Sequence, residues 1–249
     1  MIEYIFNFLL LLVTNKLRHN TFEMLLYTAT TMSTISTPNL SELLAPMAEI
    51  LPEQADAKAS EKFLRLCLQH AKKPIITTSF GPQSGVLLHM VSKIAPNIKV
   101  VWVDSGYNLP ATYKHAEKLT KELGLNLKVY TPSTSAAFWD ATRGGIPTVD
   151  DERHADFTDN FKITPFQQAL AELQPDVWIS SVRREQSAHR ASLPAVHIGP
   201  AGIIKLAPFI TWQESDMQAY LDTHNIADES RYFDPVKAQY GRECGLHKL

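Results

Sequence analysis

The sequence has few cysteines, no excess of positive charge and no apolar run of membrane-spanning length. Its 249 residues include two cysteines, Cys67 and Cys244, too few for a disulfide framework, a zinc site or an iron–sulfur cluster. The formal net charge of −2 gives no overall attraction toward nucleic acid or an anionic membrane. We therefore expect a protein of the reducing cytoplasm, in which any anion site has to be built locally.

An apolar run at residues 1–13 is too short for a membrane span, which needs roughly 20 apolar residues. It also differs from a signal peptide, because Glu3 precedes its apolar core and the basic residues follow it. We interpret residues 1–37 as an extension outside the fold. We favour a translation start at Met24 or Met32, which N-terminal sequencing of the native protein would test.

Apolar, β-branched runs alternate with segments of helical periodicity over the rest of the chain, which has 45% hydrophobic and 20% charged residues. This rhythm predicts an α/β fold: an open, mostly parallel, twisted sheet with helices on both faces. We expect one domain at 38–224 and a flexible C-terminal tail at 225–249. The expected strands are 74–78, 98–103, 125–130 and 176–181, with a hairpin at 195–198 and 203–206; the expected helices include 41–50, 55–71, 111–123, 133–142, 164–173 and 212–224, and residues 143–160 are interpreted as a functional loop.

The stretch at residues 73–90 organises the chain. A buried strand ending at Thr78 leads through the turn residues 79–84 into a helix, and such a turn exposes backbone N–H groups beside the positive end of a helix dipole. Hydroxyl groups on Thr77, Thr78 and Ser79 add further donors. The pattern favours either a phosphate or sulfate site or an ordinary β–α turn, and it is not a Walker A loop.

Two other clusters follow predicted strands. Asp104 follows the strand at 98–103, where open α/β sheets bind ligands, although it is equally suited to cap the helix that begins near Pro110. Three arginines and a histidine lie within residues 183–190 after the fourth strand. Arginine binds phosphate or sulfate through two parallel hydrogen bonds, whereas a charged run on its own is usually a solvated helix face.

The two cysteines differ in their surroundings. Cys67 lies on the apolar side of a predicted helix and is interpreted as a small buried hydrophobe. Cys244 lies among Arg242, His247 and Lys248, an electropositive setting that stabilises a thiolate. Taken alone, a cysteine in a tail is more often incidental than catalytic.

Together these segments resemble a known family. The ending Arg-Glu-Cys-Gly-Leu-His at 242–247 is similar to the catalytic C-terminus of the thioredoxin-dependent phosphoadenylyl-sulfate (PAPS) reductases of the PP-loop superfamily. The resemblance runs from about residue 55 onward. It includes Thr-Thr-Ser-Phe-Gly-Pro-Gln-Ser at 77–84, Val-Asp-Ser-Gly-Tyr at 103–107, Phe-Lys-Ile-Thr-Pro at 161–165 and Arg-Arg-Glu-Gln-Ser at 183–187.

The resemblance implies an oxidoreductase of assimilatory sulfate reduction, leading to cysteine biosynthesis. Cys244 would attack the sulfate sulfur of PAPS to give an S-sulfocysteine, and thioredoxin or glutaredoxin would release sulfite, with Arg242 and His247 favouring the thiolate. The family is commonly homodimeric. The implied substrate-binding residues are Thr77, Thr78, Ser79, Phe80, Gly81, Gln83 and Ser84 for the phosphosulfate, Asp104, Ser105, Gly106 and Tyr107 for adenosine, and Arg183, Arg184 and Arg190 for the phosphates, with Lys162 as a further candidate.

The chain departs from the family's patterns in two places. It lacks the paired cysteines that hold a four-iron cluster in the adenylyl-sulfate (APS) reducing branch, with Asp159 and Asn160 near that position, so we expect no bound cofactor and PAPS as substrate. The segment before the tail is also shorter than usual and lacks the expected Tyr-x-Ser-x-Gly-Asp run. This shortening makes the reach of the tail and the substrate open questions.

Three other functions compete with PAPS reduction. A cluster-free APS reductase would use the same Cys244 and differ in recognition of the 3′-phosphate. An ATP-cleaving adenylyltransferase would use the same loop without a terminal thiol, and would stay active after Cys244→Ser. A nucleotide sensor would bind ligand without releasing sulfite.

Overall fold

The computed structural model describes residues 40–199 and 202–237, which belong to the compact unit that begins at Leu40. Its sheet has six strands in the order β3-β2-β1-β4-β6-β5, and all neighbours are parallel except β5 and β6. The strands are β1 (Pro74–Thr78), β2 (Lys99–Val103), β3 (Asn126–Tyr130), β4 (Val177–Ile179), β5 (Val196–Ile198) and β6 (Ile204–Leu206). The predicted mostly parallel sheet and its antiparallel hairpin are confirmed.

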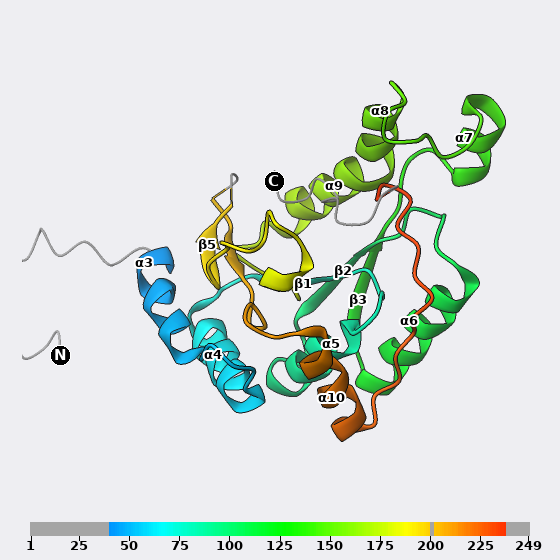
Figure 1. Cartoon of the computed structure of the whole chain (residues 1–249). Helices are drawn as coiled ribbons and strands as arrows, with labels where there is room; N and C mark the ends of the chain where they lie inside the picture. Colours follow the sequence, from blue (N-terminus) through cyan, green and yellow to red (C-terminus); the bar gives the residue numbers. More distant parts are fainter. Residues whose placement is uncertain (1–39, 200–201, 238–249) are drawn as a thin grey trace, which may run out of the picture. The chain divides into compact units, whose positions relative to one another are not determined.

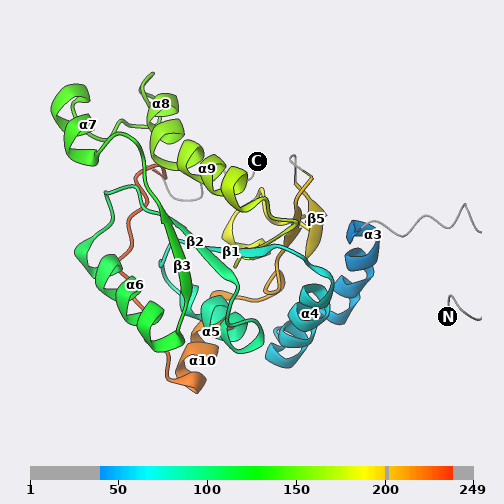
Figure 2. The same cartoon turned by 180° about the vertical axis from the view of Figure 1, so that it is seen from behind.

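Helices cover both faces of this sheet, as predicted (Figure 1 and Figure 2). The helical elements are α3 (Leu40–Leu44), η1 (Ala45–Ile50), α4 (Ala57–His70), α5 (Ser84–Ile94), α6 (Pro110–Leu123), α7 (Ala136–Arg143), α8 (His154–Thr158), η2 (Asp159–Ile163), α9 (Thr164–Leu173), η3 (Arg184–Gln186) and α10 (Glu214–His224). No helix in the two described ranges is long and apolar enough to cross a membrane.

Alternation along the strands divides the core between the two faces. Ile76 and its neighbours pack in the larger cluster with α4, α5, α6 and α10, whereas Ile75 packs with Phe166 and Ala169 of α9 on the opposite face. Because successive strand residues point to opposite sides, a strand buried on both faces is apolar throughout. Cys67 is fully buried in the larger cluster, and burial raises the pKa of its thiol to about 12, as expected of a structural cysteine.

Two local predictions were wrong. The segment 143–160 is not one loop, because α8 begins at His154 and continues through the π-helical η2 into α9. Phe157 and Phe161 lie one helical turn apart and pack with Trp139, a pattern that the polar residues around them conceal in the sequence. The helix expected at 41–50 is α-helical only to Leu44 and then narrows to the 3-10 helix η1, which has a proline in its first turn.

The order of the strands places a switch point between β1 and β4. From β1 the chain adds β2 and β3 on one side, and it later adds β4 and β6 on the other. Connections at such a point leave the sheet in opposite directions, and the crevice between them is where open α/β sheets bind ligands. The residues that follow β1 and β4 are therefore the first place to look for a site.

Candidate active site

The turn between β1 and α5 is wound tightly around two left-handed residues. Phe80 and Gln83 have φ angles of 50° and 60°. Phe80 is 1% exposed and packs edge-on against Trp102, and its backbone N–H donates to Thr78 Oγ1 at 3.0 Å. Phe80 thus anchors the loop to the hydrophobic core. Its side chain packs in that core, although the family resemblance places Phe80 among the substrate-binding residues.

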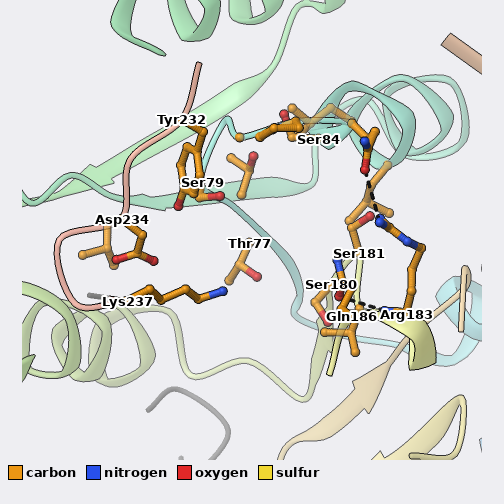
Figure 3. Close-up of a pocket in the computed structure, with 18 of the residues that line it drawn as sticks. Thr77, Ser79, Ser84, Ser180, Ser181, Arg183, Gln186, Tyr232, Asp234 and Lys237 are labelled. Carbon is orange, nitrogen blue, oxygen red and sulfur yellow. Dashed lines mark hydrogen bonds between the residues drawn. The ribbon is translucent and has the colours of Figure 1, made fainter. Parts of the chain in front are cut away.

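A cavity of about 430 Å³ opens at the carboxyl ends of β1 and β4 (Figure 3). This volume lies within the usual range for small-molecule sites, roughly 300–1,000 Å³. One wall is the loop from Thr77 to Ser84, and the facing wall contains Ser180, Ser181 and Arg183. Apolar side chains of Leu87, Val101, Val103 and Phe166 also line the cavity.

Hydroxyl groups in this cavity are arranged to donate hydrogen bonds. Thr77 Oγ1 accepts from Trp178 Nε1 at 2.9 Å, and Thr78 Oγ1 accepts from the Phe80 amide, so each hydroxyl keeps its own proton for another acceptor. Ser84 Oγ and Ser181 Oγ are buried without a hydrogen-bond partner among the described residues. Buried hydroxyls without a protein partner can bond to a ligand in the cavity, and donors that converge beside the N-terminus of α5 suit an anion.

Four cationic side chains of the described residues line the same cavity, from Lys162, Arg183, Arg190 and Lys237. Arg183 is 5% exposed; its Nε donates to Glu185 Oε1 at 2.9 Å and its Nη2 to Gln83 Oε1 at 3.2 Å. Arg190 contacts Gln186 through Nη1. Arg184 does not line the cavity, since its Nε donates to the carbonyl of Leu193.

Residues 225–237, which we call the strap, follow α10 and pack across the loop. Asp228 Oδ1 accepts from the Gln83 backbone N–H at 2.9 Å. A Cβ placed on Gly81 would lie 3.1 Å from the ring of Tyr232, so a larger residue at 81 would have to push this ring away by a few tenths of an ångström. Asp234 is 9% exposed and accepts from Lys162 Nζ at 3.2 Å. The strap thereby contributes Tyr232, Asp234 and Lys237 to the cavity.

The predicted adenosine residues lie at the end of β2, beside the main cavity. Asp104 Oδ1 accepts from the Gly106 N–H, Asn108 Nδ2 and the Tyr113 hydroxyl, at 2.9, 2.8 and 2.8 Å. Burial, followed by this hydrogen bond, raises the pKa of Tyr113 to about 12. The alternative that Asp104 caps α6 is wrong, because Leu109 occupies the N-cap position and Asp104 instead organises its own loop.

The other two predicted adenosine residues differ in their surroundings. Ser105 lines a small space next to the cavity. Tyr107 packs against Phe157 and Phe161, and its hydroxyl donates to Asp140 Oδ1 at 2.7 Å. The predicted tail residues Arg242, Cys244 and His247 lie outside the described residues.

Comparison with known proteins identifies the family. Residues 73–234 match the model of the phosphoadenosine phosphosulfate reductase domain. The chain belongs to this family of oxidoreductases. It is 36% identical over 196 residues to phosphoadenosine 5′-phosphosulfate reductases of Shigella dysenteriae serotype 1 and Escherichia coli strain K12, which covers 70% of this chain and 80% of each relative. A crystal structure of the PAPS reductase from Candida auris, a phosphate complex, shares the fold with a TM-score of 0.63 and 22% identity, covering 78% of this chain and 90% of that one.

Some residues that line the cavity of this PAPS reductase family member were not predicted from the sequence. Ser180 and Ser181 follow β4 at the same sheet edge as Asp104 follows β2, but the predicted strand extended to residue 181 and so included both serines. With the strand ending at Ile179, the rule that selected Asp104 also selects them. Tyr232, Asp234 and Lys237 carried no signal, because the strap's path over the loop is a tertiary feature. The hydroxyl-rich loop, Arg183, Arg190 and Lys162 do come together around one cavity.

Proposed function

We propose that this chain reduces PAPS to sulfite and adenosine 3′,5′-bisphosphate, with thioredoxin or glutaredoxin as the electron donor. The observation that carries the proposal is the cavity at the β1–β4 switch point. It combines four hydroxyl donors (Thr77, Thr78, Ser84 and Ser181) with four cationic side chains, in a chain of the PAPS reductase family. Its substrate is rich in anionic oxygen, which such a donor set suits.

In this proposal the phosphosulfate lies against the loop 77–84, near the N-terminus of α5, and Arg183 and Arg190 neutralise phosphate oxygens from the β4 side. The adenosine extends toward the end of β2, where Val103 and Phe166 supply apolar wall. Asp104 and Ser105 hold the loop at that end. Arg184 then acts on the loop after β4 through its bond to Leu193.

Cys244 supplies the nucleophile. Its thiolate attacks the sulfate sulfur, a sulfur–sulfur bond forms, and the bond to the phosphate oxygen breaks to release adenosine 3′,5′-bisphosphate. A thioredoxin thiolate then attacks Cys244 Sγ and expels sulfite, and its second thiol resolves the mixed disulfide. The donor loses two electrons, which reduce the sulfur from sulfate to sulfite. Arg242 and His247 stabilise the Cys244 thiolate.

The test is sulfite release from PAPS and from APS, measured in parallel with thioredoxin, thioredoxin reductase and NADPH. Cys244→Ser should abolish release, whereas Cys67→Ala, a matched control in the buried core, should retain it. In Cys67→Ala, incubation with PAPS alone should add one sulfonate group to Cys244, visible by mass spectrometry. Preference for APS would overturn the substrate, and unchanged release by Cys244→Ser would overturn the mechanism.

The proposal also covers the compartment, the oligomeric state and the cofactor content of the enzyme. A reducing cytoplasm would supply the thiol donor that the reaction consumes. We propose a homodimer with no resident cofactor, which sedimentation velocity and metal analysis of the purified protein would test. A monomer, or bound iron at one cluster per chain, would overturn these two points separately.

A further inference from the structure

Lys237 differs from the other cationic residues of the cavity in its side-chain partners. Lys162 is paired with Asp234, and Arg183 with Glu185. The ammonium group of Lys237 has no hydrogen-bond or ion-pair partner among the described residues. In Figure 3 this side chain extends from the strap into the cavity, toward Thr77. A cation that faces hydroxyl donors across a cavity is suited to bind an anionic ligand together with them.

The backbone that carries Lys237 is held in place. Its N–H donates to the Asp234 carbonyl at 3.0 Å, which closes a turn, and Val236 N–H donates to Asp234 Oδ1 at 3.2 Å. Val236 is 2% exposed and packs in the cluster with Trp139 and Phe161. The turn therefore fixes the position of the Lys237 backbone. Only the flexible outer part of the side chain has to be ordered when a ligand binds.

The charges that line the cavity show how much Lys237 contributes. Among the described residues, four cationic side chains line the cavity with two carboxylates, Asp234 and Glu214, and Glu185 pairs with Arg183 beside it, which leaves an excess of one positive charge. Without Lys237, the charges of these described residues would balance. Lys237 is also the cation next to Thr77, at the end of the cavity formed by the loop, whereas Arg183 lies on the β4 side (Figure 3).

We propose that Lys237 is a substrate-binding residue that contacts the phosphosulfate group, and that this contact fastens the strap over the loop. The inference rests on the proposed function and goes beyond it, since it assigns a role to the strap. Cys244 follows Lys237 by seven residues. A substrate that binds both the loop and Lys237 fixes the point from which the nucleophile must reach the sulfur, so binding and positioning are coupled.

The test begins with binding in the full-length Cys244→Ser protein, which holds PAPS without turnover. Titration calorimetry compares this protein with versions that also carry Lys237→Met, Lys237→Arg or Lys121→Met, the last being a matched control on the exposed face of α6. Loss of one hydrogen bond between charged groups weakens binding about 10- to 100-fold, so we expect that loss for Lys237→Met. We expect substantial recovery for Lys237→Arg and no change for Lys121→Met.

Two further measurements separate this role from others. In enzyme that retains Cys244, Lys237→Met should lower kcat/KM for PAPS and APS by the same factor, because both carry the phosphosulfate. A loss for PAPS alone would place Lys237 at the 3′-phosphate and overturn the assignment. Hydrogen exchange of residues 226–237 should slow when PAPS saturates Cys244→Ser, and slow less in the double variant. Equal protection in both would overturn the fastening role.

Failure of this inference is distinguishable from failure of the proposed function. If Cys244→Ser itself binds no PAPS, the proposed function fails before any Lys237 variant is compared. If it binds PAPS and Lys237→Met binds equally well, the proposed function stands and the role of Lys237 is wrong. The side chain of Lys237 has no partner among the described residues, so thermal unfolding of Lys237→Met should match that of Lys121→Met.

Discussion

Gln83 and Gln174 share a left-handed backbone but differ in what their side chains hold. Their φ angles are 60° and 46°. Gln83 is 7% exposed; its Nε2 donates to Glu214 Oε1 at 3.0 Å, and its Oε1 accepts from Arg183 Nη2 at 3.2 Å. Gln174 ends α9 on the surface, where its Oε1 accepts from Lys73 Nζ at 3.2 Å. Comparing a glycine substitution at each position measures how much the buried hydrogen bonds of Gln83 contribute to the free energy of unfolding.

The backbone effects of glycine nearly cancel at both positions. The left-handed conformation costs a residue with a Cβ about 1 to 2 kcal/mol, and the extra freedom of glycine in the unfolded chain costs about 0.5 to 1 kcal/mol. Gln174→Gly should therefore change the free energy of unfolding by about 1 kcal/mol or less. Gln83→Gly also removes two hydrogen bonds to charged groups, each worth about 1.5 to 3 kcal/mol, so we expect it to be less stable by about 2 to 5 kcal/mol.

Urea unfolding, followed by tryptophan fluorescence and by circular dichroism, gives both values if the two probes coincide and the m-values agree. Gln83→Ala serves as a further control, because it loses the amide and keeps the backbone cost, and it should be at least as unstable as Gln83→Gly. Equal stability of Gln83→Gly and Gln174→Gly would refute the reasoning. It would mean that the backbone alone holds the loop and that Arg183 does not depend on Gln83.

Three other predictions follow from buried groups. Trp178→Phe keeps an aromatic ring but removes the donor to Thr77, so we expect affinity for adenosine 3′,5′-bisphosphate, measured by calorimetry, to fall about 3- to 10-fold. The smaller ring should also lower the stability of the core by about 1 to 3 kcal/mol, and unchanged affinity would contradict the prediction. Burial lowers the pKa of His89 to about 4, below its unfolded value of 6.5, so the unfolded state binds more protons below pH 6.5 and stability should fall as the pH drops from 7 to 5, with a smaller slope in urea titrations of His89→Gln. The raised pKa of Cys67 predicts that iodoacetamide at pH 8 leaves this thiol unmodified in the native protein and modifies it after unfolding, as read by mass spectrometry; labelling of Cys67 in the native protein would refute its burial.

The parallel sheet could be predicted because local and global signals agree in it. The strands β1 and β2 are continuous apolar or β-branched runs, and Gly124 takes the left-handed conformation expected of a residue that ends a helix. The carboxyl ends of parallel strands meet at one edge, so residues after β1 and β4 could be assigned to one site without knowing the strand order. This is why the hydroxyl loop and Arg183 were found together.

The features that could not be predicted depend on three-dimensional geometry, which the identity of neighbouring residues does not determine. Arg183 and Arg184 are adjacent and chemically identical, yet η3 directs one toward Gln83 and the other toward Leu193. The π-helical step at η2 breaks the 3.6-residue period that would have extended α9 backward.

The path of the strap explains how Cys244 can reach the substrate even though the segment before the tail is short. If the tail left the fold at the end of α10, a shorter segment would limit how far Cys244 could extend toward the substrate. The strap instead crosses the loop and enters the cavity wall at Tyr232, Asp234 and Lys237. Seven residues from Lys237 to Cys244 span at most about 25 Å, and the cavity of about 430 Å³ is only roughly 8 Å across if compact, so a long lead is unnecessary. The missing Tyr-x-Ser-x-Gly-Asp run is thus compatible with catalysis, provided that the strap stays on the loop. Weakening the hydrogen bond that the Gln83 N–H donates to Asp228 should then lower kcat more than it raises KM.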